Sequence, residues 1–200
     1  MTMIQMSSTS KTKLGVLASG TGSNLEAIMK SCQKKEYPAY VGVVISDHKD
    51  APALKKAIAH NIPGVFLNSK LFESREAYDQ MLLATLKQYQ VDLVILAGFM
   101  RILSPIFVQA FPKRILNIHP ALLPQFRGSH AVQDVLKAGL TETGCTVHFV
   151  DEGVDTGPVI LQAKVSILKN DTEETLHQRI KEKEHILYPK AIFEVIKSLK

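Results

Sequence analysis

Residues 13–34 read KLGVLASGTGSNLEAIMKSCQK, which is an apolar run, a glycine-rich loop and an amphipathic segment in succession. The run over residues 13–18 has the length and composition of a β-strand. Ser23 with Glu26 three residues later is a capping-box pattern, which predicts a helix over residues 24–34. The stretch therefore indicates the first half of a βαβ unit.

The same alternation continues to residue 118. Four further apolar runs, separated by amphipathic segments, are predicted strands over residues 40–46, 65–67, 92–96 and 114–118. Strands that alternate with helices build a parallel sheet with helices on both faces. We therefore expect an α/β, Rossmann-like fold with a mostly parallel twisted sheet.

The second half of the chain departs from this alternation. A predicted helix near residues 129–138 precedes two predicted strands, 144–150 and 157–165, on either side of the loop 151–157. We expect these strands to extend the same sheet as an antiparallel element. No linker-like tract or internal repeat divides the chain, so residues 13–200 are expected to form a single domain.

Two more helix starts are marked in the sequence. Ser104 followed by Pro105 is a predicted N-cap with proline at the first helical position. Asp171 with Glu174 predicts the start of the last helix.

Length and composition limit the class of protein. The chain has 200 residues, 46% of them hydrophobic and 22% charged, which is enough to bury a core without disulfide or metal staples. Its longest apolar run is of strand length, well short of the roughly 20 residues that span a membrane. Residues 1–12 are polar and lack the apolar centre of a signal peptide, so we expect a disordered start and a cytoplasmic protein.

Charge and cysteine content argue against several other classes of protein. Cys32 and Cys145 lie far apart without C-x-x-C spacing, which disfavours a disulfide framework or a zinc site. The net charge of +5 suits an anionic partner, but lysines gather near the two ends of the chain. Solvated surface is therefore favoured over a nucleic-acid patch.

The loop over residues 19–24 joins the first predicted strand to its helix. Gly20 and Gly22 let the backbone approach a ligand, and amide groups at a helix start attract anions, so a phosphate fits here. The loop lacks the Gly-Lys-Ser/Thr of a Walker A loop, and Leu25 replaces the third glycine of a dinucleotide fingerprint. A tight turn without a ligand is the alternative.

Asn117 and His119 stand at the end of the fifth predicted strand. Residues two apart on a strand share a face, so both side chains should project together while Ile118 enters the core. Pro120 keeps His119 extended at the carboxyl end of the sheet, where open α/β folds bind ligands. A structural histidine is the alternative to a catalytic one.

Two other loops carry candidate chemistry. The loop 151–157 holds three carboxylates, and we expect one of them to orient His119 and raise its pKa. A solvated acidic turn or a metal loop is the alternative, although the spacing does not match an EF-hand. The segment 98–104 mixes flexible, apolar and cationic residues, which suits a flat heteroaromatic ligand or an ordinary connection.

Four motifs in this order resemble the glycinamide ribonucleotide formyltransferase family. They are GTGSN at residues 20–24, AGFMRILS at 97–104, NIHPALLP at 117–124 and DEGVDTGP at 151–158. The resemblance runs from about Lys13 to the last helix. It implies that a formyl group is transferred from 10-formyltetrahydrofolate to the amine of glycinamide ribonucleotide in purine biosynthesis.

The resemblance implies a catalytic group of Asn117, His119 and Asp155. Attack of the substrate amine on the formyl carbon would give a tetrahedral intermediate, whose oxyanion Asn117 and a protonated His119 would stabilise. Asp155 would support the imidazolium and, through water, help to move the proton to the leaving folate nitrogen. No metal and no covalent enzyme intermediate is required.

The resemblance also implies two binding sites. Gly22, Ser23 and Asn24 would hold the ribonucleotide phosphate, and Glu184 would contact the ribose hydroxyls, although a helix salt bridge is the alternative for Glu184. The implied folate site is larger and comprises Arg75, Met100, Arg101, Ile102, Leu103, Asn117, Val150, Asp151 and Val154. The expected partners are the two small molecules, without nucleic acid or membrane, and the protein would be a monomer or homodimer.

One position departs from the family pattern. Arg127 precedes Gly128 where many relatives carry proline, and the related methionyl-tRNA formyltransferases carry Arg-Gly. Those enzymes use a tRNA as the formyl acceptor, and formyltetrahydrofolate deformylases use water. Each carries an additional domain, for which we expect 200 residues to leave no room. A non-catalytic Rossmann-like binding module would leave the joint presence of Asn117, His119 and Asp155 unexplained.

Overall fold

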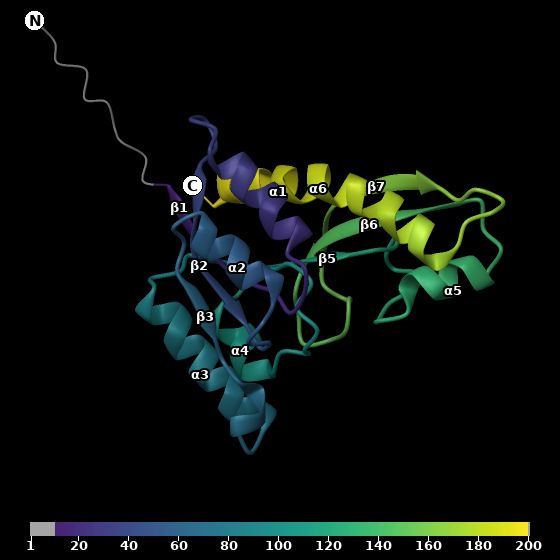
Figure 1. Ribbon diagram of the computed structural model, residues 1–200. Helices are drawn as coiled ribbons and strands as arrows, with labels where there is room; N and C mark the ends of the chain where they lie inside the picture. Colours follow the sequence, from purple (N-terminus) through teal and green to yellow (C-terminus); the bar gives the residue numbers. More distant parts are fainter. Residues whose placement is uncertain (1–10, 200) are drawn as a thin grey trace, which may run out of the picture.

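The computed structural model describes residues 11–199, and the strands of this part of the chain form one seven-stranded sheet (Figure 1). The strand order is β3-β2-β1-β4-β5-β6-β7. Strands β1 to β5 pair in parallel, while β5–β6 and β6–β7 are antiparallel. The strands are β1 Thr12–Leu17, β2 Ala39–Ser46, β3 Gly64–Phe66, β4 Leu93–Leu96, β5 Ile115–His119, β6 Glu142–Phe149 and β7 Val159–Ser166. The predicted fold class is therefore confirmed, including the antiparallel element in the C-terminal half.

Helices cover both faces of the sheet, as the alternating pattern predicted. They are α1 Ser23–Cys32, α2 Pro52–Ala59, α3 Arg75–Gln88, α4 Pro105–Ala110, α5 Ala131–Lys137 and α6 Glu173–Ser198, with a short 3₁₀ turn at Ser69–Leu71. One buried cluster joins Val16 to side chains of α1, α2, α5 and α6, and a second joins Leu17 to α3 and α4. Adjacent residues of β1 thus enter opposite cores, because side chains alternate along a strand.

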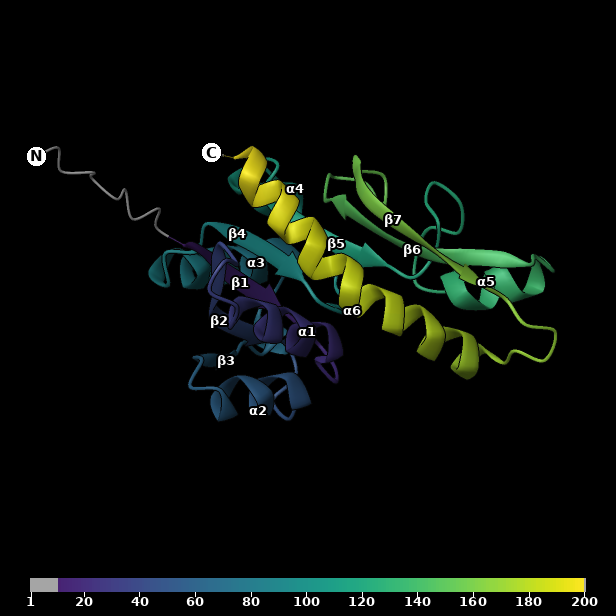
Figure 2. The ribbon, with the colours of Figure 1, turned by 90° about the horizontal axis from the view of Figure 1, so that it is seen from above.

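The long helix α6 links the two halves of the sheet. It lies beside α1 and reaches from there to β6 and β7 (Figures 1 and 2). Within the core, the Tyr188 hydroxyl lies 2.9 Å from the carbonyl oxygen of Leu96 at the end of β4 and 2.8 Å from that of Leu116 in β5. This buried contact holds α6 against the two strands whose ends carry Leu96 and His119.

The predicted start of α1 was wrong in its details. Gly22, rather than Ser23, is the N-cap, and its φ of 71° lies in the left-handed region that favours glycine. No side chain caps this helix, and Glu26 instead pairs with Lys30 at 3.1 Å and Lys56 at 2.7 Å. The amide groups at the start of α1 are therefore left without a side-chain cap.

The other helix starts also shift from the prediction. Thr172 caps α6 through a capping box with Thr175, one residue later than expected, because the carboxylate of Asp171 is bound by Arg179 at 2.6 and 2.8 Å. Ser104 is the N-cap position of α4, as predicted, but its hydroxyl makes no capping bond.

Two expectations concern the start of the chain and its lack of a membrane-spanning segment. The expected disordered start over residues 1–12 falls largely on residues 1–10, which lie outside the described part, and Thr12 already belongs to β1. Between residues 11 and 199, no helix is both long enough and apolar enough to cross a membrane.

Tyr188→Phe tests the contact between α6 and the sheet. Removing the hydroxyl takes a buried donor from two carbonyl oxygens, so we expect the free energy of unfolding to fall by about 1–2 kcal/mol in urea denaturation. The matched control is Tyr40→Phe, since Tyr40 is 40% exposed and should be close to neutral. Equal stability of Tyr188→Phe and the control would contradict a role for this hydroxyl.

Candidate active site

A cavity of about 720 Å³ is formed by segments that follow β1, β4 and β5, together with the β6–β7 loop and α6. The chain passes from β1 toward β2 on one side and from β4 toward β5 on the other, so the strand order reverses between β1 and β4. Open α/β sheets bind ligands at the carboxyl ends of strands next to such a reversal. The topology therefore explains why the loops meet here.

The predicted site residues converge on this cavity, with one exception. Arg75, the first residue of α3, is not among the lining residues, and its guanidinium pairs with Glu76 at 3.4 Å. Its role in folate binding stays a prediction. The cavity is lined by all the others: Gly22, Ser23, Asn24, Met100, Arg101, Ile102, Leu103, Asn117, His119, Val150, Asp151, Val154, Asp155 and Glu184.

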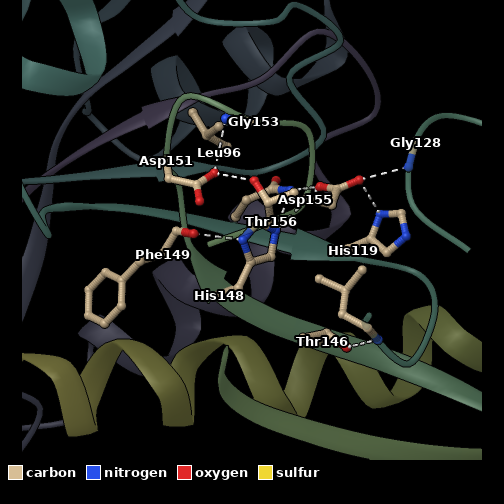
Figure 3. A network of polar contacts seen from close by, with 12 residues as sticks. Leu96, His119, Gly128, Thr146, His148, Phe149, Asp151, Gly153, Asp155 and Thr156 are labelled. Atoms are coloured by element: carbon tan, nitrogen blue, oxygen red, sulfur yellow. Dashed lines mark hydrogen bonds and ion pairs between the residues drawn. The ribbon is translucent and has the colours of Figure 1, made fainter. Parts of the chain in front are cut away.

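Asp155 is the centre of a polar network at the end of β5 (Figure 3). Its Oδ2 lies 3.2 Å from His119 Nδ1 and accepts a 2.9 Å hydrogen bond from the Gly128 backbone, while its Oδ1 lies 3.3 Å from Asn117 Nδ2. As the period of two predicted, Asn117 and His119 project toward the same side of β5. The spacing of residues left open which carboxylate of the loop 151–157 faces them, whereas the family resemblance pointed to Asp155, and the structure places Asp155 there.

Burial and hydrogen bonding compete at Asp155. Desolvation raises the pKa of its carboxyl, but the contacts with His148 and the Gly128 N–H, with the nearby His119, outweigh it and lower the pKa to about 2. The group therefore has the environment of a stable carboxylate.

His119 responds to the same environment in the opposite way. Burial lowers the pKa of its imidazole below the usual value, and the neighbouring Asp155 and Phe126 carbonyl offset this only in part. The expectation that a carboxylate would raise the pKa of His119 is thus right about the contact and the direction of its effect, but burial outweighs that effect. The sequence could not show that the ring is only 4% exposed.

The proton positions on His119 follow from its two contacts. Nε2 lies 2.7 Å from the Phe126 carbonyl oxygen, which can only accept, so this nitrogen carries a hydrogen. Nδ1 faces the Asp155 carboxylate, which also accepts. A second proton on Nδ1 would form a charge-assisted bond there, whereas the neutral ring is favoured by burial. The ring is therefore suited to take up and release a proton at Nδ1.

His148 is a member of the network that the sequence analysis missed. It lies opposite Asn117 in the antiparallel β5–β6 pair, with its Nε2 3.4 Å from Asp155 Oδ1 and 3.2 Å from Asn117 Nδ2. Its Nδ1 lies 2.7 Å from the Phe149 carbonyl oxygen. Thr146 and His148, two polar residues that share one face of β6, were the available signal, but the strand register needed to place them cannot be read from sequence.

The loop after β1 and helix α6 form the second half of the cavity. Asn24 Nδ2 donates a 2.8 Å hydrogen bond to Glu184 Oε2, and both residues are buried. Burial raises the pKa of Glu184, against the lowering effect of this bond. Among residues 11–199, Asn24 Oδ1 is buried without a hydrogen-bond partner. Glu184 thus contacts α1 instead of forming a helix salt bridge, and both residues of the pair line the cavity.

The segment after β4 gives the cavity an apolar rim. Met100 is 75% exposed, Ile102 58% and Val154, from the β6–β7 loop, 45%. Exposed apolar side chains gathered at a cavity are typical of a ligand site. Over residues 11–199, no group of three or more His, Cys, Asp or Glu side chains is placed to hold a metal ion.

Comparison with known proteins gives consistent matches. Residues 12–192 match the model of the family described as "Formyl transferase". The phosphoribosylglycinamide formyltransferase of Bacillus subtilis is 40% identical over 92% of this chain and 94% of its own length. A solved structure, glycinamide ribonucleotide transformylase 1 from Symbiobacterium toebii, superposes with a TM-score of 0.92 at 45% identity, over 96% of this chain and 90% of that one.

A longer relative matches over only part of its length. The trifunctional purine biosynthetic protein adenosine-3 of Bos taurus is 47% identical over 91% of this chain, which spans 18% of that protein.

Asp155→Asn tests the electrostatic coupling within the network. Since the Asp155 carboxylate raises the pKa of His119 against burial, its neutralisation should lower that pKa further, as followed by NMR titration of the imidazole Cε1 proton. Glu152→Gln removes a charge from the same loop, where Glu152 contacts Gln109, and should leave the His119 titration in place. An unchanged titration in Asp155→Asn would show that the two groups are not coupled.

Proposed function

Because the chain belongs to the formyl transferase family, we propose that it transfers a formyl group from 10-formyltetrahydrofolate to the amine of glycinamide ribonucleotide. The products are formylglycinamide ribonucleotide and tetrahydrofolate, in de novo purine biosynthesis. The resemblance drawn from the four sequence motifs is confirmed by the family match. The observation that carries the proposal is the convergence of Asn117, His119 and Asp155 with the loop after β1 in one cavity.

The ribonucleotide half of the site is supported by two features. The start of α1 offers amide groups without a side-chain cap, beside Gly22 in the left-handed region, which suits a phosphate. Asn24 Oδ1 and the Glu184 carboxylate are acceptors, which suit the hydroxyl donors of a ribose. We assign the phosphate to residues 22–24 and the ribose to Glu184.

The folate half is supported by the rim of exposed apolar side chains. Met100 and Ile102 from one segment and Val154 from another flank the polar network. A flat heteroaromatic ring that buried these side chains would place its substituents next to Asn117 and Asp155. We assign the pterin to the residues Met100, Arg101, Ile102, Leu103, Val150, Asp151 and Val154.

The chemistry needs one bond formed, one bond broken and one proton moved. The amine nitrogen bonds to the formyl carbon, the bond from that carbon to the folate nitrogen breaks, and a proton passes from the amine to the folate nitrogen. Negative charge develops on the formyl oxygen meanwhile, and Asn117 with protonated His119 are the donors assigned to it. In the structure these donors face Asp155 and the Phe126 carbonyl, so the substrate oxygen must compete for them.

Asp155 has two roles in this scheme. Its low pKa keeps it ionised, so it stabilises the imidazolium form of His119. A carboxylate beside the reacting groups can also direct a water molecule that carries the proton between the two nitrogens.

We place this activity in the cytoplasm, where Cys32 and Cys145 would stay reduced, in a monomer or homodimer that acts on small molecules.

Steady-state formyl transfer to glycinamide ribonucleotide, followed by folate absorbance, tests the reaction. We expect turnover by the wild type and a fall in kcat of at least about 10²-fold in His119→Ala, because an oxyanion donor is lost. His60→Ala is the control, since His60 is exposed at the end of α2 and should keep wild-type rates. If the folded wild type shows no turnover, glycinamide ribonucleotide is not the formyl acceptor. Release of formate in the absence of the ribonucleotide would identify water as the acceptor.

Asp155→Asn tests the charge partner in the same assay. We expect kcat to fall by about 10²-fold, because the amide cannot stabilise the imidazolium, while the KM values change little. Glu152→Gln should behave as the wild type. Near-normal turnover in Asp155→Asn would remove this residue from the mechanism.

A further inference from the structure

Ser19 connects three segments at the base of the cavity. Its backbone N–H donates to the Gly98 carbonyl at 3.0 Å, and its hydroxyl accepts a 3.0 Å hydrogen bond from the Met100 N–H. The same hydroxyl donates a 2.7 Å bond to Asp47 Oδ1, at the end of β2. Ser19 itself lies outside the lining of the cavity, directly before the loop that begins at Gly20.

Asp47 fixes the direction of the Ser19 hydroxyl. The Asp47 side chain is only 6% exposed, and its Oδ1 also contacts His48 Nδ1 at 2.9 Å. A hydroxyl has one hydrogen and can rotate, so a strong acceptor on one side leaves the oxygen lone pairs available on the other. The carboxylate therefore holds Ser19 in the orientation that accepts the Met100 N–H.

The segment that Ser19 holds is irregular and exposes its apolar side chains. Residues 97–104 contain no helix or strand, and Gly98 has a φ of 74°. Further along, Arg101 donates to Ser69 Oγ at 3.1 Å, and the Ser104 N–H donates to Asp79 Oδ2 at 2.6 Å. These contacts brace the far part of the segment against α3 and the 3₁₀ turn. Ser19 braces the part that carries Met100, from the side of the ribonucleotide loop.

Such bracing matters because an exposed loop must otherwise be ordered when a ligand binds. Ordering backbone and side chains at a binding surface weakens affinity, and a loop already held in place avoids that loss. Ser19 lies outside the lining of the cavity, and its hydroxyl is engaged by Asp47 and the Met100 N–H, so its effect on the ground state and on the transition state should be the same. A change in KM without a matching change in kcat is the signature of such a role.

We propose that Ser19, oriented by Asp47, is a positioning residue that presets the segment around Met100 for the folate substrate. The inference rests on the proposed function, because it assigns this segment to the folate. It adds a residue that lies outside the lining of the cavity.

The test compares Ser19→Ala, Asp47→Ala and the double variant with the wild type, varying each substrate in turn. Ser19→Ala should raise the KM for the 10-formyl folate about tenfold, as expected for loss of a hydrogen bond coupled to a charge, with kcat and the ribonucleotide KM changed less than about threefold. Asp47→Ala should act in the same direction. The double variant should be no worse than Ser19→Ala, since both remove one linkage.

Three controls separate positioning from a general loss of structure. Ser198→Ala removes an exposed serine hydroxyl that bonds the Val195 carbonyl at the end of α6, and it should keep wild-type kinetics. Asp47→Asn keeps an oxygen acceptor for the Ser19 hydroxyl and should retain most of the folate affinity. Thermal unfolding of each variant shows whether the fold persists.

The outcomes distinguish this proposal from the function on which it rests. Calorimetric titration with tetrahydrofolate measures binding without turnover, and Ser19→Ala should weaken it by the same factor as the KM. Absence of formyl transfer by the wild type, with tetrahydrofolate binding still weakened in Ser19→Ala, would refute the reaction and support the positioning role. Three results would overturn the positioning role of Ser19. The first is a folate KM and a tetrahydrofolate affinity within twofold of the wild type in Ser19→Ala. The others are additive effects of the two alanine variants, or a lowered kcat at unchanged KM.

Discussion

The site depends on keeping one half-buried carboxylate ionised. Asp155 loses much of its hydration, and such a loss favours the neutral acid unless donors replace the water. Here the donors come from separate parts of the chain: β5 supplies Asn117 and His119, β6 supplies His148, and the loop before α5 supplies the Gly128 N–H. Three segments are therefore held in register by a single charge.

The backbone at Asp155 shows the same constraint. Its φ of 52° lies in the left-handed region, which a residue other than glycine occupies at an energetic cost. Two residues later, a Cβ on Gly157 would stand 1.9 Å from the Phe149 carbonyl oxygen, so the β6–β7 loop folds back tightly on the end of β6. The hydrogen bonds to the carboxylate hold this strained loop, and the loop in turn directs the carboxylate at His119.

Much of this arrangement could be predicted from local sequence, and the remainder depends on contacts between distant segments. The period of two along β5 places Asn117 and His119 on one face, and the alternation of strands and helices gives the parallel part of the sheet. The partnership of His148 depends on an antiparallel register, and the net pKa direction of His119 depends on how deeply other segments bury it. The sequence pattern predicted Ser23 as the N-cap of α1, but the N-cap is Gly22. The backbone at Gly22 is left-handed, and a capping pattern does not reveal such a conformation.

The bond between Asn24 and Glu184 joins residues 160 positions apart. During synthesis on the ribosome, α1 emerges well before α6, so Asn24 has no Glu184 to bond until α6 has been made and has docked against α1. The pair is therefore a property of the folded chain and not of any segment alone. If the proposed ribose assignment holds, a ligand held by both residues would bind only the folded form and would stabilise it.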